Sequence, residues 1–470
     1  MDKLIKDLKS LNLKTNEVFK SEVSDTLFFD YARSIVSKPN SGLLLSGGDL
    51  DCSRYSIAGW EPFLVVKAKG RTVTIQKNGG KWEREGDPLE ILDEVFSRLK
   101  PDFPLVIPPF SGGAMGYLAY ELKNIIESLP QTTEDDLGLP DLFLFFPQKI
   151  LVHDRQEKRL SFLELSERES GKGLEPLAGC CSSSNWTDGL EIWDSKSNFL
   201  REDYLKAVSR IRRYIKDGDV YQVNLSQRFS FSYKGDPVLL FKRLFNRNPA
   251  PFYAFINAGD HEIISTSMER FLYRKGPYIE TRPIKGTRAR GMTLKEDQAQ
   301  CRALKESPKD DAELSMIVDL LRNDLGRVCD PRSIRVAEHK RLEAYQNVFH
   351  LVSIITGGLP STVLPGDLIR ATFPGGSITG CPKIRSMEII DELEPHVRHV
   401  YTGAIGYLGW HENLDLNIAI RTAIHQGDKC YFSVGGAVVY DSDEEEEFQE
   451  TLDKGQTFFN VVQSLKKEFS

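Results

Sequence analysis

The chain has 470 residues, of which 40% are hydrophobic and 27% charged, as is typical of folded globular proteins. Its net charge of -7 and the lack of a basic stripe interleaved with aromatics argue against nucleic-acid binding. The seven cysteines form no C-x-x-C pair, which favours free thiols in a reducing compartment. We find no apolar run that could cross a membrane and no signal-peptide pattern, so we expect a cytoplasmic protein that binds no membrane.

Short strand patterns dominate residues 1–165. Ser41–Ser46 predicts a buried strand, and Pro88–Leu99 has the spacing of a helix. The segment 166–197 carries glycine, serine, glutamate and proline with little periodicity, which predicts a linker or surface excursion. The sequence therefore divides into an N-terminal region and a second region, 198–470.

The second region opens with a predicted helix, Glu202–Lys216, and a predicted strand, Asp219–Phe229. Gln222, Asn224 and Ser226 share one face of that strand, and the opposite face is mostly apolar. A polar face suits either solvent or a ligand cleft, and the pattern alone favours solvent.

Carboxylates occur in pairs near two predicted helix starts. Asp310 and Glu313 belong to a predicted helix at 308–327, and Glu447 and Glu450 to the last helix. Acidic groups near a helix start are stabilised by the helix dipole, and this effect alone can account for each pair. Magnesium also prefers carboxylate oxygens. The pairs would form a metal site only if the fold brings them together.

The stretch Glu280–Gly291 packs three arginines and a lysine into twelve residues, and Pro283, Gly286 and Gly291 interrupt it, which argues against an amphipathic helix. Lys285 lies between Ile284 and Gly286. It is either a solvated loop cation or a reactive amine, and the local pattern favours the first interpretation.

Three patterns nearer the C-terminus complete the second region. Phe373–Thr379 is a glycine-rich turn ahead of a helix, and such a turn can present backbone N–H groups to an anion. Ala404–Gly409 and Asn417–Ala423 predict buried strands, and the second carries Arg421.

These motifs resemble the chorismate-binding enzymes, a family that includes anthranilate, isochorismate and aminodeoxychorismate synthases. The resemblance extends from about Phe199 to Leu465, and residues 1–165 are similar, more loosely, to the companion region of anthranilate synthase component I. It implies an α/β fold of the α+β type, with two packed antiparallel sheets covered by helices. The matching segments are Tyr221–Ser226, Ser267–Phe271, Pro283–Thr287, Asp311–Asp324, Pro374–Lys383, Tyr401–Tyr407 and Gln449–Thr451.

The resemblance implies a Mg²⁺ ion and a dianionic substrate, chorismate. Glu313 and Glu450 would bind the metal directly, with Asp310 and Glu447 acting through water. The ion would hold one chorismate carboxylate. The other carboxylate and the remaining surface of the substrate would contact a further set of residues. That set is Arg421, Gly435, Gly436, Lys454, Thr287, His350, Ser377 and Tyr401.

The resemblance also implies a reaction. Lysine at position 285 is typical of enzymes that aminate C4 of chorismate, for 4-aminobenzoate and folate synthesis, through a lysine adduct at C2. Gln222 replaces the lysine with which isochorismate synthases activate water. Glu269 would be the general acid. A free lysine amine is almost fully protonated at pH 7, and Arg282, Arg288 and Arg290 are candidates for lowering its pKa.

Several alternatives stay open at this stage. No Gly-x-Cys-x-Gly glutaminase turn occurs, so we expect ammonia from solution or from a separate glutamine amidotransferase subunit in a heterodimer. Anthranilate synthesis, with release of pyruvate, is the main rival activity, and a non-catalytic homologue is a second. Leu45 and Ser46 mark a possible pocket for an aromatic effector.

Overall fold

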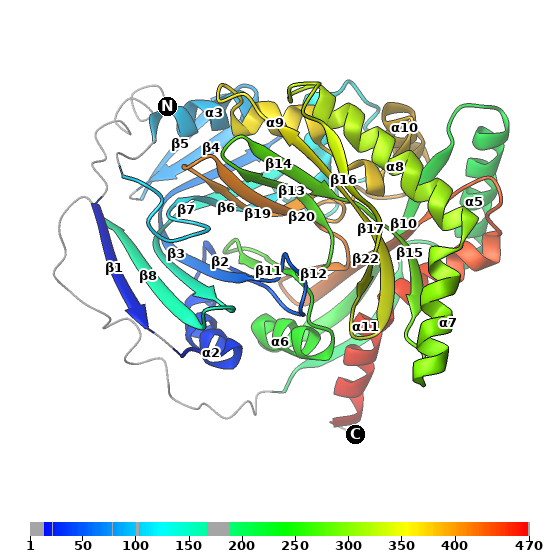
Figure 1. Cartoon of the computed structure of the whole chain (residues 1–470), viewed down its shortest axis with the longest axis horizontal. Helices are drawn as coiled ribbons and strands as arrows, with labels where there is room; N and C mark the ends of the chain where they lie inside the picture. The colour runs from blue at the N-terminus through cyan, green and yellow to red at the C-terminus, as the bar shows by residue number, and fades with distance from the viewer. Residues whose placement is uncertain (1–13, 21, 78, 100–102, 167–188, 469–470) are drawn as a thin grey trace.

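The computed structural model describes residues 14–468 except 21, 78, 100–102 and 167–188. Its strands form two antiparallel layers joined by two long strands, β3 (Tyr55–Lys69) and β7 (Leu142–Asp154) (Figure 1). The first half of β3 pairs with β2 and its second half with β4. β7 likewise divides its pairing between β6 and β8. This ribbon therefore belongs to both layers.

Neighbouring strands in each layer pair antiparallel. Beside β3 and β7, the first layer contains β9 (Glu191–Ser197), β10 (Gln222–Lys234), β22 (Lys429–Val438), β21 (Thr422–Gln426), β12 (Glu262–Ser267), β11 (Phe252–Asn257), β2 (Ser41–Leu45), β8 (Arg159–Ser166) and β1 (Lys14–Lys20). The second contains β5 (Gly80–Glu85), β4 (Thr72–Lys77), β6 (Gly113–Leu118), β19 (Ala404–Gly409), β20 (Asn413–Ile418), β13 (Arg270–Lys275), β14 (Tyr278–Arg282), β17 (Val348–Gly358), β15 (Ile284–Ala289) and β16 (Arg335–Ala344). The two-residue strand β18 (Gly380–Cys381) pairs with β10.

The two layers enclose one hydrophobic core, which confirms the predicted pair of packed antiparallel sheets. Leu225 and Ile256 of the first layer share this core with Ile405 and Leu416 of the second. In each layer the strands from before position 165 form one block and those from after it another, and the blocks meet where β2 pairs with β11 and where β6 pairs with β19. The N-terminal region thus extends both sheets that carry the second region.

Helices cover the outer faces of both layers (Figure 1). Ser307 caps α8, accepting a hydrogen bond from the Asp310 amide at 3.3 Å, as the sequence predicts. No helix within the described ranges is long and apolar enough to cross a membrane. The helices are α2 (Asp25–Val36), α3 (Pro88–Arg98), η2 (Tyr120–Leu122), α4 (Lys123–Ile126), α5 (Arg201–Lys216), α6 (Pro237–Arg247), α7 (Leu294–Lys305), α8 (Pro308–Gly326), α9 (Pro365–Thr372), η4 (Gly376–Ile378), α10 (Lys383–Leu393) and α11 (Glu444–Glu468).

Two predicted elements need correction. Residues 167–188 of the predicted linker lie outside the described residues, but Glu191–Ser197 is strand β9, paired with β10. This strand buries only Ile192 and so lacks the alternation that would have revealed it. The strand predicted over 417–423 is instead interrupted, because Arg421 has a left-handed backbone with φ of +50°.

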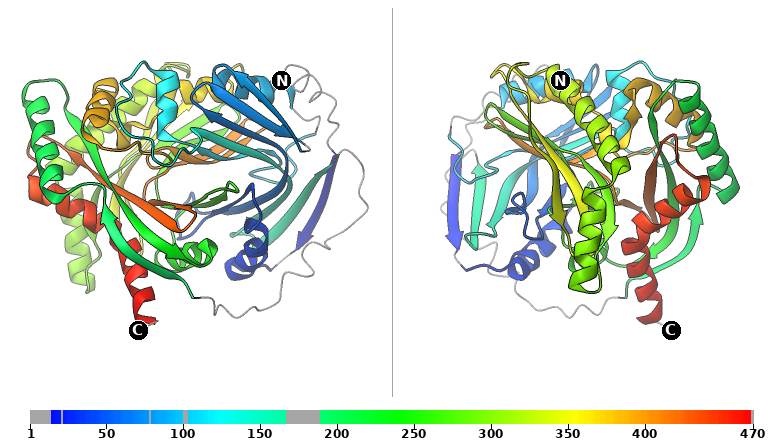
Figure 2. Two further views of the ribbon diagram at one scale, coloured as in Figure 1. Left: turned by 180° about the vertical axis from the view of Figure 1, so that it is seen from behind. Right: turned by 45° about the vertical axis from the view of Figure 1, so that its right-hand side comes forward.

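Figure 2 shows β1 and β8 at one end of the molecule and α5 at the other.

Candidate functional site

A cavity of about 600 Å³ lies beside β15, α8, β22 and α11. Its lining gathers residues that are far apart in the sequence, and it includes the predicted catalytic, metal-binding and substrate-binding side chains. Those predicted residues are Glu269, Lys285, Thr287, Asp310, Glu313, His350, Ser377, Tyr401, Arg421, Gly435, Glu447, Glu450 and Lys454. Gly436 lies immediately beside them, next to Glu447 and Lys454.

Lys285 projects from β15 at a bulge in its pairing with β17. The next residue, Gly286, has a φ of +69°, and a side chain there would come within 2.9 Å of Leu304 and 3.1 Å of Asp310. Glycine therefore permits the bulge that presents Lys285. Burial lowers the pKa of the Lys285 amine, Lys454 lowers it further, and nearby carboxylates such as Glu313 oppose this shift. The net effect favours the neutral, nucleophilic amine.

The three arginines near Lys285 serve other partners, which corrects their predicted role. Arg282 pairs with Glu280 and Asp51. Arg290 pairs with Asp297, and Arg288 approaches Asp310 at 3.5 Å. Their charges are thus directed at carboxylates. Burial and the ammonium group of Lys454, from a helix more than 160 residues further along the chain, lower the pKa instead.

Glu269 occupies the short connection between β12 and β13 and is 4% exposed. Burial raises the pKa of its carboxyl to about 7, and a hydrogen bond donated by the Ser377 hydroxyl at 2.5 Å limits that rise. A carboxylic acid with a pKa near neutrality holds a proton that it can transfer to a leaving group. The cavity thus contains a candidate amine nucleophile and a candidate acid.

His350 lies on β17, opposite Thr287 of the paired strand β15, and is 2% exposed. Its Nδ1 lies 3.0 Å from the Thr287 hydroxyl and 3.3 Å from the Gly286 carbonyl, while Nε2 has no hydrogen-bond partner in the described structure. Burial and the charge of Arg421 lower the pKa of this imidazole to about 3. The ring is therefore neutral, and a proton on Nδ1, donated to the carbonyl, leaves Nε2 as an acceptor.

Two cations from different elements, Arg421 and Lys454, face the same cavity. Arg421 lies between β20 and β21, and among the described residues its guanidinium makes no hydrogen bond or ion pair. Burial lowers the pKa of Arg421. Lys454 donates to the Gly435 carbonyl at 3.2 Å and pairs with Glu450 at 2.6 Å. The guanidinium of Arg421 is half-buried and faces the cavity, so a ligand carboxylate could pair with it.

The acidic residues fit a cation, although the protein supplies an incomplete ligand set. Glu447 accepts a hydrogen bond from the Ser442 hydroxyl at 2.5 Å, and its second oxygen is buried without a partner. Burial and the charge of Glu450 raise the pKa of Glu447 to about 7. In the parts of the chain described here, no three acidic, histidine or cysteine side chains converge as a metal cluster. Magnesium often takes only one or two carboxylates, with water and substrate oxygens completing its ligands.

The polar face of β10 turns toward the protein interior, which corrects the expectation that it faces solvent. Gln222 is fully buried, and Asn224 donates to the Ser377 carbonyl at 2.8 Å. Ser226 donates from its amide and its hydroxyl to Glu394. Glu394 and its partner Arg398 were missed from the sequence. Their i, i+4 spacing after a helix is the only sequence signal that could have identified them.

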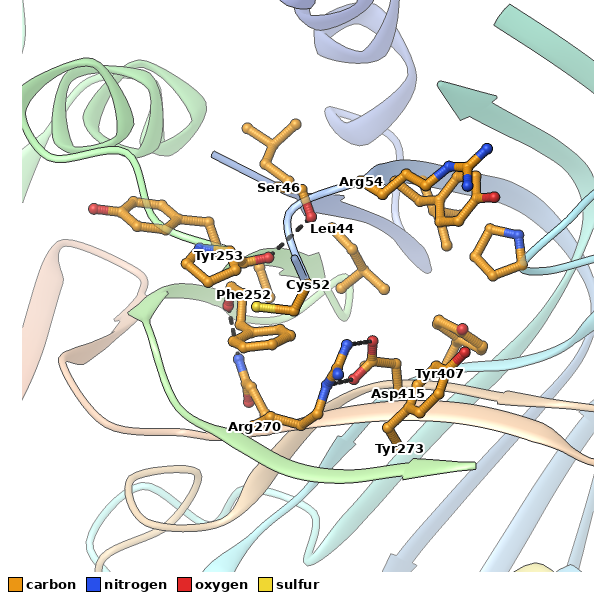
Figure 3. A pocket seen from close by; sticks show the side chains of 18 of the residues that line it. Leu44, Ser46, Cys52, Arg54, Phe252, Tyr253, Arg270, Tyr273, Tyr407 and Asp415 are labelled. Atoms are coloured by element: carbon orange, nitrogen blue, oxygen red, sulfur yellow. Dashed lines mark hydrogen bonds and ion pairs between the residues drawn. The ribbon is translucent and has the colours of Figure 1, made fainter. Parts of the chain in front are cut away.

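A second cavity, of about 470 Å³, includes Leu45 and Ser46, the residues predicted to mark an effector pocket. Ser46 donates to the Pro251 carbonyl at 3.1 Å. Figure 3 shows Arg270 and Asp415 facing one another at this cavity, bonded at 2.8 and 3.0 Å. Most of its charged lining residues are thus paired with one another, namely Asp51, Arg270, Glu280, Arg282 and Asp415, and aromatic rings supply much of the remaining surface.

Comparison with known proteins agrees with this geometry. Residues 52–460 match the chorismate binding enzyme family. Aminodeoxychorismate synthase component 1 of Escherichia coli (strain K12) is 40% identical over 88% of this chain and 92% of that protein. Anthranilate synthase component 1 of Acetivibrio thermocellus is 34% identical over 87% of each.

A solved structure supports the same assignment. The crystal structure of anthranilate synthase component I from Streptococcus pneumoniae TIGR4 superposes with a TM-score of 0.74. The two chains are 32% identical, and the match covers 87% of this chain and 92% of the other. With its sheets, its cavity and its motifs in agreement, the chain belongs to the chorismate binding enzyme family.

Proposed function

We propose that this protein aminates chorismate at C4 and yields 4-amino-4-deoxychorismate and water. The observation that carries the proposal is the placement of Lys285, with a lowered amine pKa, in one cavity with Glu269, whose carboxyl has a pKa of about 7. An amine that is partly neutral and an acid that is partly protonated at the same pH can act together. The relatives named aminodeoxychorismate synthase component 1 add support.

The reaction proceeds in two displacements. The Lys285 amine forms a bond to C2, the ring double bond shifts, and the C4–O bond breaks as Glu269 gives its proton to the departing hydroxyl, which leaves as water. Ammonia then forms a bond to C4, the double bond shifts back, and the C2–N bond to Lys285 breaks. A proton from the new ammonium group restores Glu269, so the enzyme returns to its starting state.

The other residues of the cavity hold the substrate. Arg421 and Lys454 bind one carboxylate, and the neutral His350 offers Nε2 as an acceptor. Glu313 and Glu450, supported by Asp310 and Glu447, would hold a Mg²⁺ ion, which when bound supplies positive charge for the second carboxylate. Exclusion of water by the buried cavity strengthens these contacts.

We also propose that ammonia is supplied by a separate glutamine amidotransferase subunit. The numbered component in the names of the relatives supports a multi-subunit enzyme. With chorismate and magnesium, the isolated chain is expected to use an ammonium salt and to use glutamine only after a glutaminase subunit is added. Glutamine-dependent product from the isolated chain would contradict this proposal.

Product identification tests the function. Wild-type protein incubated with chorismate, ammonium and magnesium should release 4-amino-4-deoxychorismate and no pyruvate. Lys285→Ala should lose C4 amination and retain at most slow amination at C2. Lys295→Ala, which removes an exposed lysine on α7, is the matched control and should behave as wild type.

Anthranilate synthesis is the second candidate function, favoured by His350 and by relatives named anthranilate synthase. It predicts pyruvate and a fluorescent aromatic product from the wild-type protein. Detection of both, with Lys285→Ala equally active, would replace the proposed activity with this one.

For the second cavity we propose an aromatic ligand, of which tryptophan is a candidate. The volume of about 470 Å³ and the aromatic lining around Tyr253 and Tyr407 support a ligand of that size. Ligand binding should raise the melting temperature, by mass action, and Ser46→Phe should abolish the rise. A rise that persists in Ser46→Phe would place the ligand elsewhere.

A further inference from the structure

The segment between α10 and β19 carries a buried ion pair at the wall of the catalytic cavity, where Arg398 forms part of the lining. The side chains of Glu394 and Arg398 are 4% and 3% exposed, respectively. Arg398 donates hydrogen bonds to both carboxylate oxygens of Glu394, from Nε to Oε2 at 2.9 Å and from Nη2 to Oε1 at 2.6 Å. Glu394 also accepts hydrogen bonds from the amide and hydroxyl of Ser226 on β10. This bidentate arrangement fixes the plane of the guanidinium.

The remaining donors of Arg398 are bonded to protein groups. Nη1 donates to the Ile378 carbonyl at 3.2 Å and to the Thr402 hydroxyl at 3.3 Å, and Nη2 donates to the Asn224 carbonyl at 2.7 Å. A guanidinium has five N–H groups, and these bonds with the pair to Glu394 use all five. Arg398 therefore has no donor left for a substrate carboxylate, unlike Arg421.

These bonds converge on the surroundings of the candidate acid. Ile378 follows Ser377, whose hydroxyl donates to Glu269 and whose carbonyl accepts a hydrogen bond from the side-chain Nδ2 of Asn224. Arg398 holds the backbone of both Ile378 and Asn224, and so it fixes the two sides of the Ser377 contact. A shift of this segment would move the Ser377 hydroxyl away from Glu269.

The opposite side of Arg398 is supported by the N-terminal region. The guanidinium lies over the Tyr120 ring, 4.9 Å from its centroid, and the Arg398 amide donates to Glu121 at 3.0 Å. The Tyr120 amide donates to the His399 carbonyl at 2.7 Å. Residues from before position 165 therefore hold the segment that reaches the catalytic cavity.

We propose that Arg398 is a positioning residue, which sets Ser377 against Glu269 and is itself supported by Tyr120 and Glu121. The inference rests on the proposed role of Glu269 as the acid. It assigns the N-terminal region a part in catalysis that is separate from any ligand of the second cavity.

Arg398→Lys tests this role, because it keeps a positive charge and removes the planar fork. We expect kcat for chorismate with ammonium to fall by about 100-fold, since small displacements of reacting groups have effects of that order. KM for chorismate should change by less than about threefold, because Arg398 makes no contact reserved for substrate. The Ser377 hydrogen bond lowers the pKa of Glu269, so its loss should raise that pKa and move the alkaline limb of the pH profile of kcat to higher pH.

A second pair of variants covers the case in which Arg398→Lys does not fold. Tyr120→Leu removes the ring beneath the guanidinium and should move the pH limb in the same direction with a smaller loss of kcat. Tyr120→Phe is the matched control and should match wild type, because the Tyr120 hydroxyl has no hydrogen-bond partner among the described residues.

The outcomes separate the inference from the proposed function. A raised KM with unchanged kcat would make Arg398 a substrate-binding residue, and an unmoved pH limb in the folded variants would remove the positioning role. The identity of the wild-type product tests the proposed function independently. If that product is anthranilate, the positioning role of Arg398 can still be tested, because the rate of anthranilate formation gives kcat, KM and the pH dependence of kcat.

Discussion

The two cavities differ in whether their polar and charged groups already have partners. In the first cavity, one oxygen of Glu447 and Nε2 of His350 are buried without a hydrogen-bond partner, and the half-buried Arg421 makes no ion pair among the described residues. In the second cavity, Arg270 pairs with Asp415 and with Glu280. Unpaired buried polar groups are costly, and a protein keeps them where a ligand completes them. The first cavity is thus suited to a dianion, and the second to a ligand that brings little net charge.

Two glutamates show the same difference at the level of single groups. Glu269 and Glu280 are each 4% exposed, and burial raises the pKa of both. For Glu280, ion pairs with Arg282 and Arg270 outweigh burial and hold the pKa below its usual value. Glu269 has no such pair, and its pKa rises to about 7. Similar burial therefore produces a candidate acid in one cavity and a structural anion in the other.

The largest expected effect separates these glutamates by activity. Glu269→Gln should lower kcat by about 10²–10⁴-fold, the usual contribution of a general acid. Glu280→Gln should leave kcat within a few-fold of wild type, because Glu280 lies in the second cavity. Steady-state assays with chorismate and ammonium measure both. Equal losses in the two variants would show that Glu269 has no special chemical role.

A pair of arginines provides the next comparison. Arg421→Ala should raise KM for chorismate by about 30-fold or more, since loss of a buried charged contact costs roughly 2–5 kcal/mol. Arg270→Ala should leave KM unchanged and lower the free energy of unfolding by about 3–5 kcal/mol, because it leaves the mostly buried Asp415 without a cationic partner, while Glu280 keeps Arg282. Urea denaturation measures the second effect. If Arg421→Ala destabilised the fold and left KM unchanged, the contrast between the cavities would fail.

The sequence predicted which residues share the cavity better than it predicted their electrostatics. The residues named by motif resemblance, Lys285, Glu269 and the carboxylate pairs, lie together in one cavity, and their catalytic and metal-binding roles stay predictions. Which charges are paired depends on the tertiary fold. Arg282 looked available to act on Lys285, yet it pairs with Glu280 on its own strand and with Asp51 from the distant N-terminal region. Arg398 was missed for the same reason.

Local elements of the fold were equally accessible to prediction. The cap at Ser307 and the strands predicted at Ser41–Ser46 and Ala404–Gly409 follow from residue patterns, but the pairing of β2 with β11 joins segments some 200 residues apart. The break at Arg421 was missed because a left-handed backbone at an arginine has no sequence signature. The layers themselves came from family resemblance, since periodicity cannot choose among sheet orders.

The smallest expected effect is a difference in stability with pH. Glu269 binds its proton more tightly when folded, so its contribution to stability is present below about pH 4.5 and is lost as pH rises toward 7. The loss can reach about 3 kcal/mol, at about 1.4 kcal/mol for each pKa unit. Glu269→Gln cannot ionise and should gain stability relative to wild type between pH 5 and pH 8.

Glu280→Gln should show the opposite sign. The pKa of Glu280 is lowered in the folded state, so its contribution is present at pH 8 and is lost as the pH falls below its usual value. The variant should therefore be less stable than wild type at pH 8 and approach it in acid. Urea denaturation at pH 4, 5 and 8 measures both variants. If the stability of the two variants changed with pH in parallel, both glutamates would ionise alike in the folded protein. The contrast between a first cavity with unpaired polar groups and a second cavity with internally paired charges would then fail.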